Sequence, residues 1–400
     1  MNILQICHKP CYPPIDGGSI ATYNLYKGLV DNGQHVHVLA MNTYKQYCDI
    51  SKVPADFLKN ARYRLVDVDI RLKVLPAFFN LFSKRSYNME RFNAKQFSAV
   101  LKEILENNRY DVILLETLYT MPYIDLLREK SDARIVLRTH NVEHKIWENL
   151  GRNEKNPLKK WYLSLLTGRL KHFEMQSLKQ VDLIASISEE DTSIFKQEGC
   201  TTPMMYLPFG IDMLQDEFKS YEEPDVSQIV LFHLGSMDWL PHQEAMRWFL
   251  EAVWPKVSTK HPQLHLYLAG SHMPNWISHG RYPNVMVTKG YVEANSFMRN
   301  KAIMIVPSFS GSGIRIKIAE GMAKGKVILT TKNGAMGIPA VHGENIFISD
   351  DHEEWVCILD RCLTDVEKLQ AISRSARSFA INEYDYRLTA RKLIDLLSTN

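Results

Sequence analysis

The residues best suited to chemistry lie between Pro307 and Ala323, where a loop rich in serine and glycine precedes two cations and a carboxylate. The apolar run Ala302–Val306 comes just before this loop, and a helical pattern begins at Ile314. This order predicts a strand, a glycine loop and a helix. It would place flexible backbone and free helix N–H groups at the carboxyl end of a strand, where parallel sheets bind anions and nucleotides.

The charged residues of this segment suit a nucleotide diphosphate. Arg315 and Lys317 bring positive charge for phosphates, and Glu320 brings a carboxylate for ribose hydroxyls. A second interpretation is an ordinary ion cluster, because Lys317, Glu320 and Lys324 share one helix face. The pattern alone leaves both interpretations open.

A pair of glycines, Gly17 and Gly18, stands between the predicted strand Asn2–Cys7 and a helix that Ser19 could cap. Glycine allows close backbone approach, so these amides, with the helix dipole behind them, could hold a phosphate. The alternative is a plain turn before a helix. The spacing is not that of a dinucleotide-binding GxGxxG motif.

A histidine, His140, follows the predicted strand Arg134–Arg138, and a side chain at that end of a strand can face a cleft. The alternative is a structural histidine satisfied within the fold, and His144 competes for the functional role. Glu143 could orient either ring, whereas Arg138 could pair with an acid inside the fold.

The elements that must position these residues alternate between strand and helix, which predicts doubly wound α/β architecture. A break rich in proline and charge lies near Leu207–Asp225, after which the alternation restarts. With 400 residues the chain suits two domains. The expected strands are Asn2–Cys7, Val36–Ala40, Asp111–Glu116, Arg134–Arg138, Asp182–Ser186, Ile229–Leu234, Leu264–Ala269, Val285–Val287, Ala302–Val306, Val327–Thr331 and Asn345–Ile348.

The composition excludes several classes of protein. A net charge of +3 gives no reason to expect a nucleic-acid partner, and 45% apolar residues are typical of a soluble globular chain. The six cysteines match no zinc or redox spacing. The start of the chain does not read as a signal peptide and no apolar run is long enough to span a membrane, so we expect a cytoplasmic protein.

Two stretches carry most of the positive charge. Arg71–Lys95 has six Lys or Arg against one acidic residue, and Arg138–His172 has eight against three. Both contain large apolar residues, as in Leu75–Phe82 and Trp161–Leu166. A solvated helix face is one interpretation. The other is a surface for an anionic acceptor or for peripheral contact with an anionic membrane, which would place the protein at its inner face.

The chain resembles the family 4 glycosyltransferases, the retaining nucleotide-sugar enzymes of the GT-B fold. The similarity covers nearly the whole length, and the motifs follow one another in the family's order. They are PPIDGGS near the start, RTHNVEH at Arg138–His144, ISEED at Ile187–Asp191, LPFGID at Leu207–Asp212, LGSMDWLPHQEA at Leu234–Ala245 and the segment Pro307–Ala323 followed by GKVILTT.

The resemblance implies two Rossmann-like domains facing a central cleft. Residues 1–207 would form the acceptor-side domain, and residues 208–383 would bind the donor. A terminal helix over about 384–400 would cross back to the first domain. The donor would be a nucleotide-diphosphate sugar and the acceptor a glycan, a lipid-linked molecule or another hydroxyl compound, with no metal and no resident cofactor.

The resemblance also assigns roles to individual residues. His140 would contact the donor sugar or lie beside the reacting centre, while Arg315 and Lys317 would bind the diphosphate and Glu320 the ribose. Further donor contacts would come from Gly17, Gly18, Gly235, Val292 at the base, and the backbone of Ser312, Gly313 and Ile314.

The sequence departs from the family's common pattern at two places. Ser312 stands where many members have a glutamate, and the stretch after the strand Ile229–Leu234 has neither the usual arginine nor the usual lysine. Arg315 and Lys317 would then supply the phosphate charge. The DxD-like Asp67–Asp69 lies in the first domain, and we interpret it as a surface strand or turn.

These observations favour a retaining glycosyltransferase of glycan or surface-polysaccharide assembly. Three other classes stay open, one of them a peripheral membrane protein that would use the two basic stretches. A sugar-nucleotide epimerase of the same fold would act on one substrate without an acceptor. A binding or scaffold protein would hold the nucleotide-sugar and turn nothing over.

Overall fold

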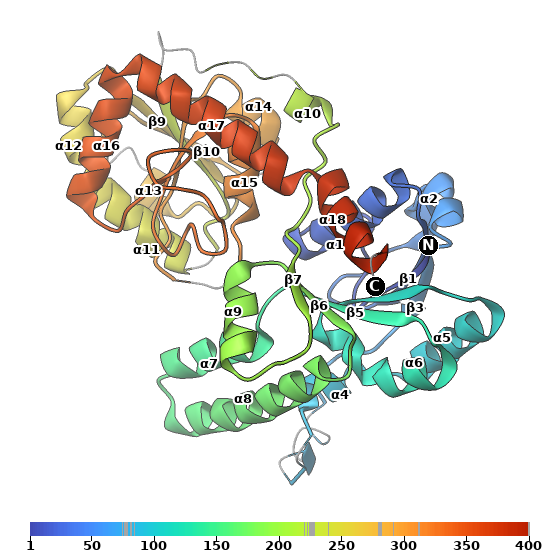
Figure 1. Ribbon diagram of the computed structural model, residues 1–400. Helices are drawn as coiled ribbons and strands as arrows, with labels where there is room; N and C mark the ends of the chain where they lie inside the picture. Colours follow the sequence, from blue (N-terminus) through green and yellow to red (C-terminus); the bar gives the residue numbers. More distant parts are fainter. Residues whose placement is uncertain are drawn as a thin grey trace. The chain divides into compact units, whose positions relative to one another are not determined.

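The computed structural model divides into two compact units, Met1–Ile211 with Tyr386–Asn400 and Asp212–Asp385 (Figure 1). Each unit is a parallel sheet with helices. The residues described are 1–73, 75, 79–80, 82–83, 85–219, 221, 223, 229–238, 240–278, 282–290, 292–310 and 313–398.

The first unit contains a seven-stranded sheet in the order β3-β2-β1-β4-β5-β6-β7, and all its pairings are parallel. The strands are β1 Asn2–Cys7, β2 His35–Asn42, β3 Arg64–Asp67, β4 Val112–Glu116, β5 Arg134–Thr139, β6 Leu183–Ser186 and β7 Met204–Tyr206. The α-helices are α1 Gly17–Asp31, α2 Ala55–Asn60, α4 Tyr87–Glu90, α5 Lys95–Asn107, α6 Ile124–Lys130, α7 Glu143–Asn153, α8 Pro157–Leu178, α9 Glu189–Gln197 and α18 Tyr386–Ser398, with 3₁₀ turns η1 Ile50–Lys52 and η2 Leu118–Tyr123.

Both faces of this sheet are covered, because its strand residues alternate between two apolar clusters. Leu4 and Ile6 of β1 belong to one cluster, and Ile3 and Cys7 belong to the other. Parallel strands buried on both sides read as continuous apolar runs, which is why β1 and β4 could be recognised in the sequence. The short edge strands β3 and β7 were not predicted.

The second unit contains a six-stranded parallel sheet in the order β10-β9-β8-β11-β12-β13. The strands are β8 Val230–Leu234, β9 His265–Gly270, β10 Val285–Lys289, β11 Ile303–Val306, β12 Val327–Thr330 and β13 Phe347–Ile348. The helices are α10 Asp216–Lys219, α11 Leu240–Trp248, the π-helical turn η4 Phe249–Val253, α12 Trp254–Lys260, α13 Asn275–Ser278, α14 Ala294–Met298, α15 Ile316–Ala323, α16 His352–Thr364 and α17 Val366–Tyr384.

The two sheets have the same strand connectivity, except that the first sheet has one more strand, β7, at one edge. In each, the chain runs from the first strand outward through two neighbours, then returns to the other side of the first strand. Such a sheet has a switch point, between β1 and β4 in the first unit and between β8 and β11 in the second. Loops leaving the carboxyl ends of these strands diverge there, and open α/β sheets bind ligands at that place. The expected pair of Rossmann-like domains is confirmed.

The structure corrects three helix boundaries. Helix α1 begins at Gly17 with Asp16 as its N-cap, so Ser19 is the third helical residue, whose hydroxyl accepts from the Asp16 N–H. The helix expected from Ile314 begins at Ile316. Helix α17 ends at Tyr384 and the terminal helix α18 begins at Tyr386, two residues later than expected.

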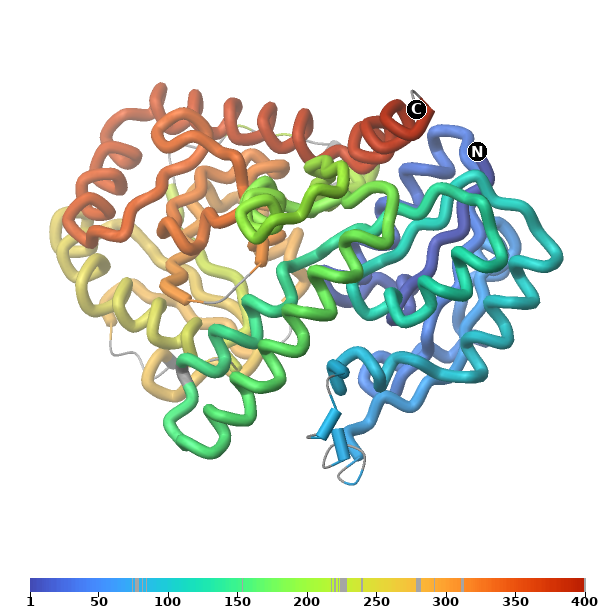
Figure 2. The backbone as a smooth tube through the Cα atoms, turned by 60° about the horizontal axis from the view of Figure 1, so that its bottom comes forward, coloured from blue at the N-terminus to red at the C-terminus, as the bar shows by residue number. Residues whose placement is uncertain are grey.

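The terminal helix α18 belongs to the first unit, where it packs against α1 (Figure 2). The backbones of α1 and α18 approach each other closely. A Cβ atom built on Gly28 of α1 would lie 2.3 Å from the Tyr386 carbonyl oxygen, and the Tyr386 N–H donates to the Ile211 carbonyl oxygen at 3.1 Å. Only glycine fits at position 28 without a shift of the backbone.

Candidate functional site

The carboxyl ends of β1, β4 and β5 bring together one group of polar residues, which we call the first cluster: His8, Lys9, Glu116, Thr117 and His140. His8 and Lys9 follow β1, Glu116 ends β4 and His140 follows β5. The cluster therefore lies at the switch point of the first sheet. Of these five residues, only His140 was predicted from the sequence. Glu116 could have been found as well, because it is a charged residue at the end of the apolar run of β4.

Glu116 is the centre of this cluster. Its side chain is 1% exposed, and His140 Nε2 lies 2.9 Å and Arg138 Nη1 3.6 Å from Glu116 Oε2. Gln5 Nε2 donates to its other oxygen at 2.7 Å. Burial raises the pKa of Glu116, but the Arg138 charge and the His140 hydrogen bond outweigh it and leave the pKa at about 2. Glu116 is therefore an anion that orients the His140 ring.

Burial is also the main influence on the two histidines of the cluster. It lowers the pKa of His140, although the Glu116 carboxylate opposes the change. Burial, Lys9 and His140 lower the pKa of His8 to about 3. The His8 Nδ1 lies 2.9 Å from the Thr117 hydroxyl. Neutral imidazoles can accept or donate a hydrogen bond to a sugar hydroxyl.

Thr117 has a backbone conformation that a β-branched residue rarely adopts, with φ 76° and ψ 162°. Its N–H donates to the Arg138 carbonyl oxygen at 2.9 Å, which holds the loop after β4 against β5. Strain of this kind costs about 1–3 kcal/mol and gathers at functional sites. It aims the Thr117 hydroxyl at His8.

The competing residues of the RTHNVEH motif have structural partners. His144 is 1% exposed, with Nδ1 2.6 Å from Glu174 Oε2 and Nε2 3.1 Å from Glu198 Oε2. The Glu143 carboxylate accepts from the Tyr119 hydroxyl at 2.8 Å. The residue that orients His140 is Glu116 and not Glu143. Arg138 is fully buried against Glu116, the pairing anticipated from the sequence.

Gly17 and Gly18 form the first turn of α1, not the loop before it. A carboxylate already caps this turn. Asp16 Oδ1 accepts from the Ser19 N–H at 2.8 Å and lies 2.7 Å from Lys9 Nζ. A Cβ on Gly18 would lie 2.7 Å from the same ammonium. The phosphate-binding role of the two glycines stays a prediction, and a bound phosphate would compete with Asp16.

A second cluster lies at the switch point of the other sheet, around Gly235, Arg315 and Lys317. Arg315 is the N-cap residue of α15. Its guanidinium donates to the carbonyl oxygens of Gly313 and Ser310 and to the Ser308 hydroxyl, at 3.3 Å for the last two. Arg315 therefore shapes the loop after β11.

Lys317 reaches across to β8, where its ammonium lies 3.4 Å from the Leu234 carbonyl oxygen. A Cβ atom on Gly235 would lie 2.9 Å from Lys317 Nζ, so this glycine makes room for the ammonium. Among the described residues no carboxylate forms an ion pair with Lys317. Burial and the neighbouring Arg315 charge lower the pKa of Lys317 to about 8.

Two histidines that sequence reasoning missed border the second cluster. His233 is buried on β8 and contacts the Ile305 carbonyl oxygen through Nδ1 at 2.8 Å. His242 contacts the Ser236 carbonyl oxygen through Nδ1 at 3.0 Å. Burial is the first cause and the Lys317 charge a further cause of the lowered pKa of both. Neutral histidines and an unpaired lysine leave this cluster with an excess of positive charge.

The remaining predicted residues lie around the second cluster. Gly313, with φ 82°, and Ile314 form the end of the loop before α15. Glu320 follows Lys317 by three residues on α15, and Val292 is half-buried in the loop before α14. Lys324 Nζ contacts Asn295 Oδ1, whereas Lys317 Nζ contacts the Leu234 carbonyl oxygen. Ser312 lies outside the described residues.

The DxD-like residues and the cysteines need no functional role. Asp67 ends the edge strand β3 and accepts from Asn42, while Asp69 pairs with Arg71 at 2.8 Å. All six cysteines are free thiols. Among the described residues, no helix is long and apolar enough to cross a membrane.

Two Rossmann-like parallel-sheet units in one chain are the architecture of the GT-B fold. The family models agree: residues 15–213 match glycosyltransferase family 4, and residues 228–365 match the glycosyl transferases group 1. The chain belongs to this glycosyltransferase family.

The chain is similar to one curated protein in sequence and to solved structures in fold. A 44.6 kDa uncharacterized protein from the cps region of Klebsiella pneumoniae is 24% identical over 391 residues, 94% of each chain. The Anabaena HepE structure in complex with UDP has a TM-score of 0.64 at 15% identity and covers all of both chains. Sucrose-phosphate synthase from Thermosynechococcus elongatus has a TM-score of 0.68 at 12% identity, over 100% and 99% of the two chains.

Proposed function

We propose that the protein is a retaining, metal-independent glycosyltransferase that moves a sugar from a nucleotide-diphosphate donor to a hydroxyl of a glycan or lipid-linked acceptor. The cps-region relative and the HepE complexes with UDP and UDP-glucose support surface-polysaccharide assembly and a nucleotide-sugar donor. No resident cofactor is needed, since the nucleotide-sugar is itself a substrate.

The observation that carries this proposal is the ammonium of Lys317 beside Arg315, with which no carboxylate in the described part of the chain forms an ion pair. A half-buried cation without a counter-ion, next to a second cation, is costly unless an anion binds there. The first turn of α15 adds to this, because its N-cap has no side chain that accepts from the helix N–H groups. Two cations and free helix amides suit the two phosphates of a nucleotide diphosphate.

In the proposed reaction the anomeric carbon loses its bond to the diphosphate oxygen and gains one to the acceptor oxygen on the same face. The acceptor's proton passes to the departing phosphate. Arg315 and Lys317 stabilise the charge that develops on the diphosphate. Glu320 binds the ribose hydroxyls, and His140, held by Glu116, binds the donor sugar.

Calorimetric titration tests the donor site. We expect Arg315→Ala and Glu320→Ala to bind UDP or GDP at least about tenfold more weakly, or ~1.4 kcal/mol. Lys332→Ala, an exposed lysine of the same unit, should bind as the wild type does. Unchanged affinity in both site variants would reject the assignment.

A separate assay tests the reaction class. Nuclear magnetic resonance of the product should show the anomeric configuration of the donor, and turnover should require an acceptor. Conversion of the nucleotide-sugar alone into an isomer would identify an epimerase. Binding without any turnover, across a panel of acceptors, would leave a scaffold protein.

A further inference from the structure

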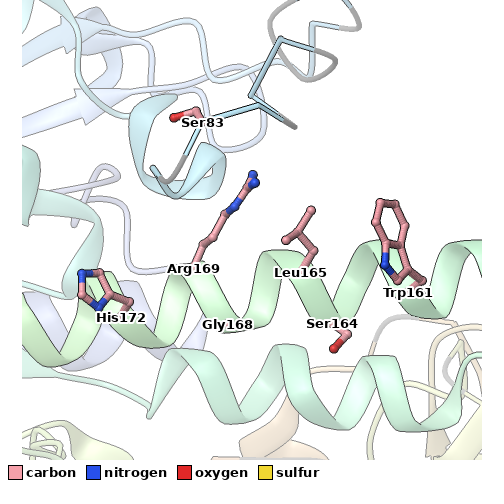
Figure 3. Close-up of a pocket in the computed structure, with 7 residues that line it drawn as sticks. All are labelled: Ser83, Trp161, Ser164, Leu165, Gly168, Arg169 and His172. Carbon is pink, nitrogen blue, oxygen red and sulfur yellow. The ribbon is translucent and has the colours of Figure 1, made fainter.

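Hollows beside two helices, α8 and α17, contain none of the residues of the two clusters. Figure 3 shows the hollow of about 660 Å³ beside α8, where the side chain of Arg169 extends toward the segment that contains Ser83. Arg169 Nη1 donates to the backbone and side-chain oxygens of Asn80 at 2.8 and 3.1 Å. This guanidinium joins the two walls of its hollow. The hollow beside α17 is smaller and has two arginines.

The hollow beside α17 belongs to the second unit and has a volume of about 270 Å³. Five of its lining residues follow one another on α17 at the spacing of a single helix face. The sixth, Tyr221, comes from the segment between α10 and β8. We call this hollow the α17 pocket, and its lining residues are Tyr221, Arg374, Arg377, Ser378, Ile381 and Asn382.

Tyr221 is a fixed wall of the α17 pocket. A Cβ atom built on Gly325 would lie 2.3 Å from Tyr221 Cε2, so the ring packs against the backbone that follows α15. The Tyr221 hydroxyl lies 2.9 Å from Ser373 Oγ, and this buried serine donates to the Gly325 carbonyl oxygen at 2.6 Å. The pocket is therefore built into the packing of α17 against the end of α15.

Arg377 is the cation at the centre of the α17 pocket. Its Nη1 donates to the Ala323 carbonyl oxygen and its Nη2 to the Phe218 carbonyl oxygen, both at 2.6 Å. Its guanidinium carbon lies 5.2 Å from the centre of the Tyr221 ring. Among the described residues no carboxylate pairs with Arg377. Ala323 ends α15, and the helix dipole there offsets only part of the charge.

The other polar residues of the α17 pocket are also hydrogen-bond donors. Arg374 pairs with Glu223, but the two side chains are 53% and 42% exposed, and an exposed pair of this kind contributes little stability. In the part of the chain that the structure describes, the exposed side chains of Ser378 and Asn382 contact no protein partner. Two arginines against one carboxylate leave the pocket with one surplus positive charge.

We propose that the α17 pocket binds a small phosphate ester that carries hydroxyl groups. A phosphate has three outer oxygens and up to two negative charges, enough for the forks of both Arg374 and Arg377, whereas a carboxylate has two oxygens and one charge. An anion bound there would replace Glu223 as the partner of Arg374.

The rest of the lining suits the organic part of such an ester. Ser378 and Asn382 can hydrogen-bond its hydroxyls, and Tyr221 and Ile381 offer apolar surface to its carbon atoms. The volume is below the range of pockets for drug-sized ligands, which favours a small molecule.

The α17 pocket is separate from the proposed donor site. Arg315 and Lys317 lie at the start of α15, whereas Arg377 contacts its last residue, Ala323. The proposal does not rest on sugar transfer, so the two sites can be removed and tested independently.

Calorimetric titration of the full chain with glycerol 3-phosphate tests the pocket. The protein carries Arg315→Ala and Lys317→Met, so that the donor site does not contribute. We expect one equivalent to bind, and inorganic phosphate to bind several-fold more weakly because it has no hydroxyl-bearing carbon chain. Absence of binding would overturn the proposal, equal affinity for succinate would overturn the choice of phosphate, and equal affinity for inorganic phosphate would overturn the ester.

Variants in the same background locate the binding. Arg374→Gln with Asn382→Ala should weaken it at least about tenfold, or ~1.4 kcal/mol, and leave the thermal unfolding temperature nearly unchanged, because both side chains are exposed. Arg377→Lys keeps the charge but loses the fork, and it should also bind more weakly. Arg361→Gln, an exposed arginine of α16, is the matched control and should bind normally. Unchanged affinity in the first variant would place the phosphate elsewhere.

A titration with UDP shows whether the two sites are separate. In a chain with an intact donor site, Arg374→Gln with Asn382→Ala should bind UDP as the wild type does. Loss of UDP affinity in this variant would show that the α17 pocket is not a separate site and would overturn the proposal.

Discussion

The two histidines of the RTHNVEH motif differ in what surrounds their rings. Among the residues that the structure describes, His140 has one partner, the buried Glu116 at Nε2, and its side chain is 9% exposed. His144 has a carboxylate at each ring nitrogen and is 1% exposed. A ring bound on both sides is a structural element, whereas a ring bound on one side keeps a nitrogen for a ligand.

We predict opposite effects for alanine at these two positions. His140→Ala should reduce sugar transfer roughly 100-fold and cost less stability than the His144 change, because the buried Glu116 keeps Arg138 and Gln5. His144→Ala should lower the free energy of unfolding by about 2–3 kcal/mol, because Glu174 loses a buried partner. Urea unfolding and turnover of the folded protein measure the two effects. A stable, fully active His140→Ala variant would contradict the role of this ring.

Lys317 gives the donor site a pH dependence. Its pKa of about 8 in the folded protein is below the usual 10.5 of lysine, chiefly because burial disfavours the charge. Between these values the unfolded chain holds more protons than the folded one, so the free energy of unfolding rises with pH across this window. Nucleotide-diphosphate affinity should fall as pH rises through about 8, because the ammonium loses its proton.

Lys317→Met should abolish both the rise in the free energy of unfolding between about pH 8 and 10.5 and the fall in nucleotide-diphosphate affinity through about pH 8. We expect the variant without ligand to be more stable than the wild type at neutral pH by about 1–2 kcal/mol, since the ammonium keeps some contact with water. Its weak UDP affinity should not change between pH 7 and about 9.5. Urea unfolding and calorimetry across this range make the measurement, and a wild-type affinity that stays constant through pH 8 would refute the assignment.

At the scale of elements, glycines set the distance between the loops that leave β8 and β9. Gly270 ends β9 with φ 152°, and a Cβ atom there would lie 1.9 Å from the Gly235 carbonyl oxygen. The Gly235 N–H in turn donates to the Ala269 carbonyl oxygen at 3.0 Å. The loop that faces Lys317 is therefore held by a backbone contact that tolerates no side chain.

Gly270→Ala should accordingly lower the free energy of unfolding by about 3 kcal/mol or more and weaken UDP binding, because the Gly235 loop must move. Gly290→Ala is the matched control. Gly290 also has a positive φ, 91°, but a Cβ atom there meets nothing within 4 Å. We expect this control to cost only about 1 kcal/mol, the strain of the backbone. Equal losses in the two variants, measured by urea unfolding, would show that the loop contact is unimportant.

At the scale of the whole molecule, helix α18, which follows the second unit in the sequence, completes the first unit. Helix α18 adds Ala390, Leu393 and Ile394 to the apolar cluster that also contains Leu25 and Leu29 of α1. Asn32 Nδ2 donates to the Arg387 carbonyl oxygen at 3.1 Å. The first unit is therefore incomplete until Tyr386–Ser398 has been synthesised.

Truncation after Asp385 should destabilise the first unit and spare the second. In calorimetric unfolding we expect the transition of the first unit to fall by about 10 °C or more, whereas the transition that UDP raises should stay in place. Arg391→Ala removes an exposed ion pair with Asp395 on the same helix and should change neither transition. A truncated chain whose two transitions match those of the full chain would contradict the assignment of α18.

The buried strands and the family could be predicted from the sequence because their signals are local. Strands β1, β4 and β5 are short apolar runs, and the segment around Arg315 and Lys317 keeps its order of loop and helix. The predicted start of α1 was wrong. Serine and aspartate are both common N-cap residues, and only the folded backbone shows that Asp16 is the N-cap. The edge strands β3 and β7 were missed because they are short and their alternation is weak.

Two successive α/β domains, and two cations after the glycine loop that follows β11, can be recognised from the order of residues alone. The groups that those residues contact are known only from the folded chain. These contacts join residues 24 to more than 80 positions apart: Glu116 with His140, Glu174 and Glu198 with His144, and Lys317 with Leu234 and Gly235. Such contacts follow from the order of strands in each sheet, and strand order is set by long-range packing that no local pattern records.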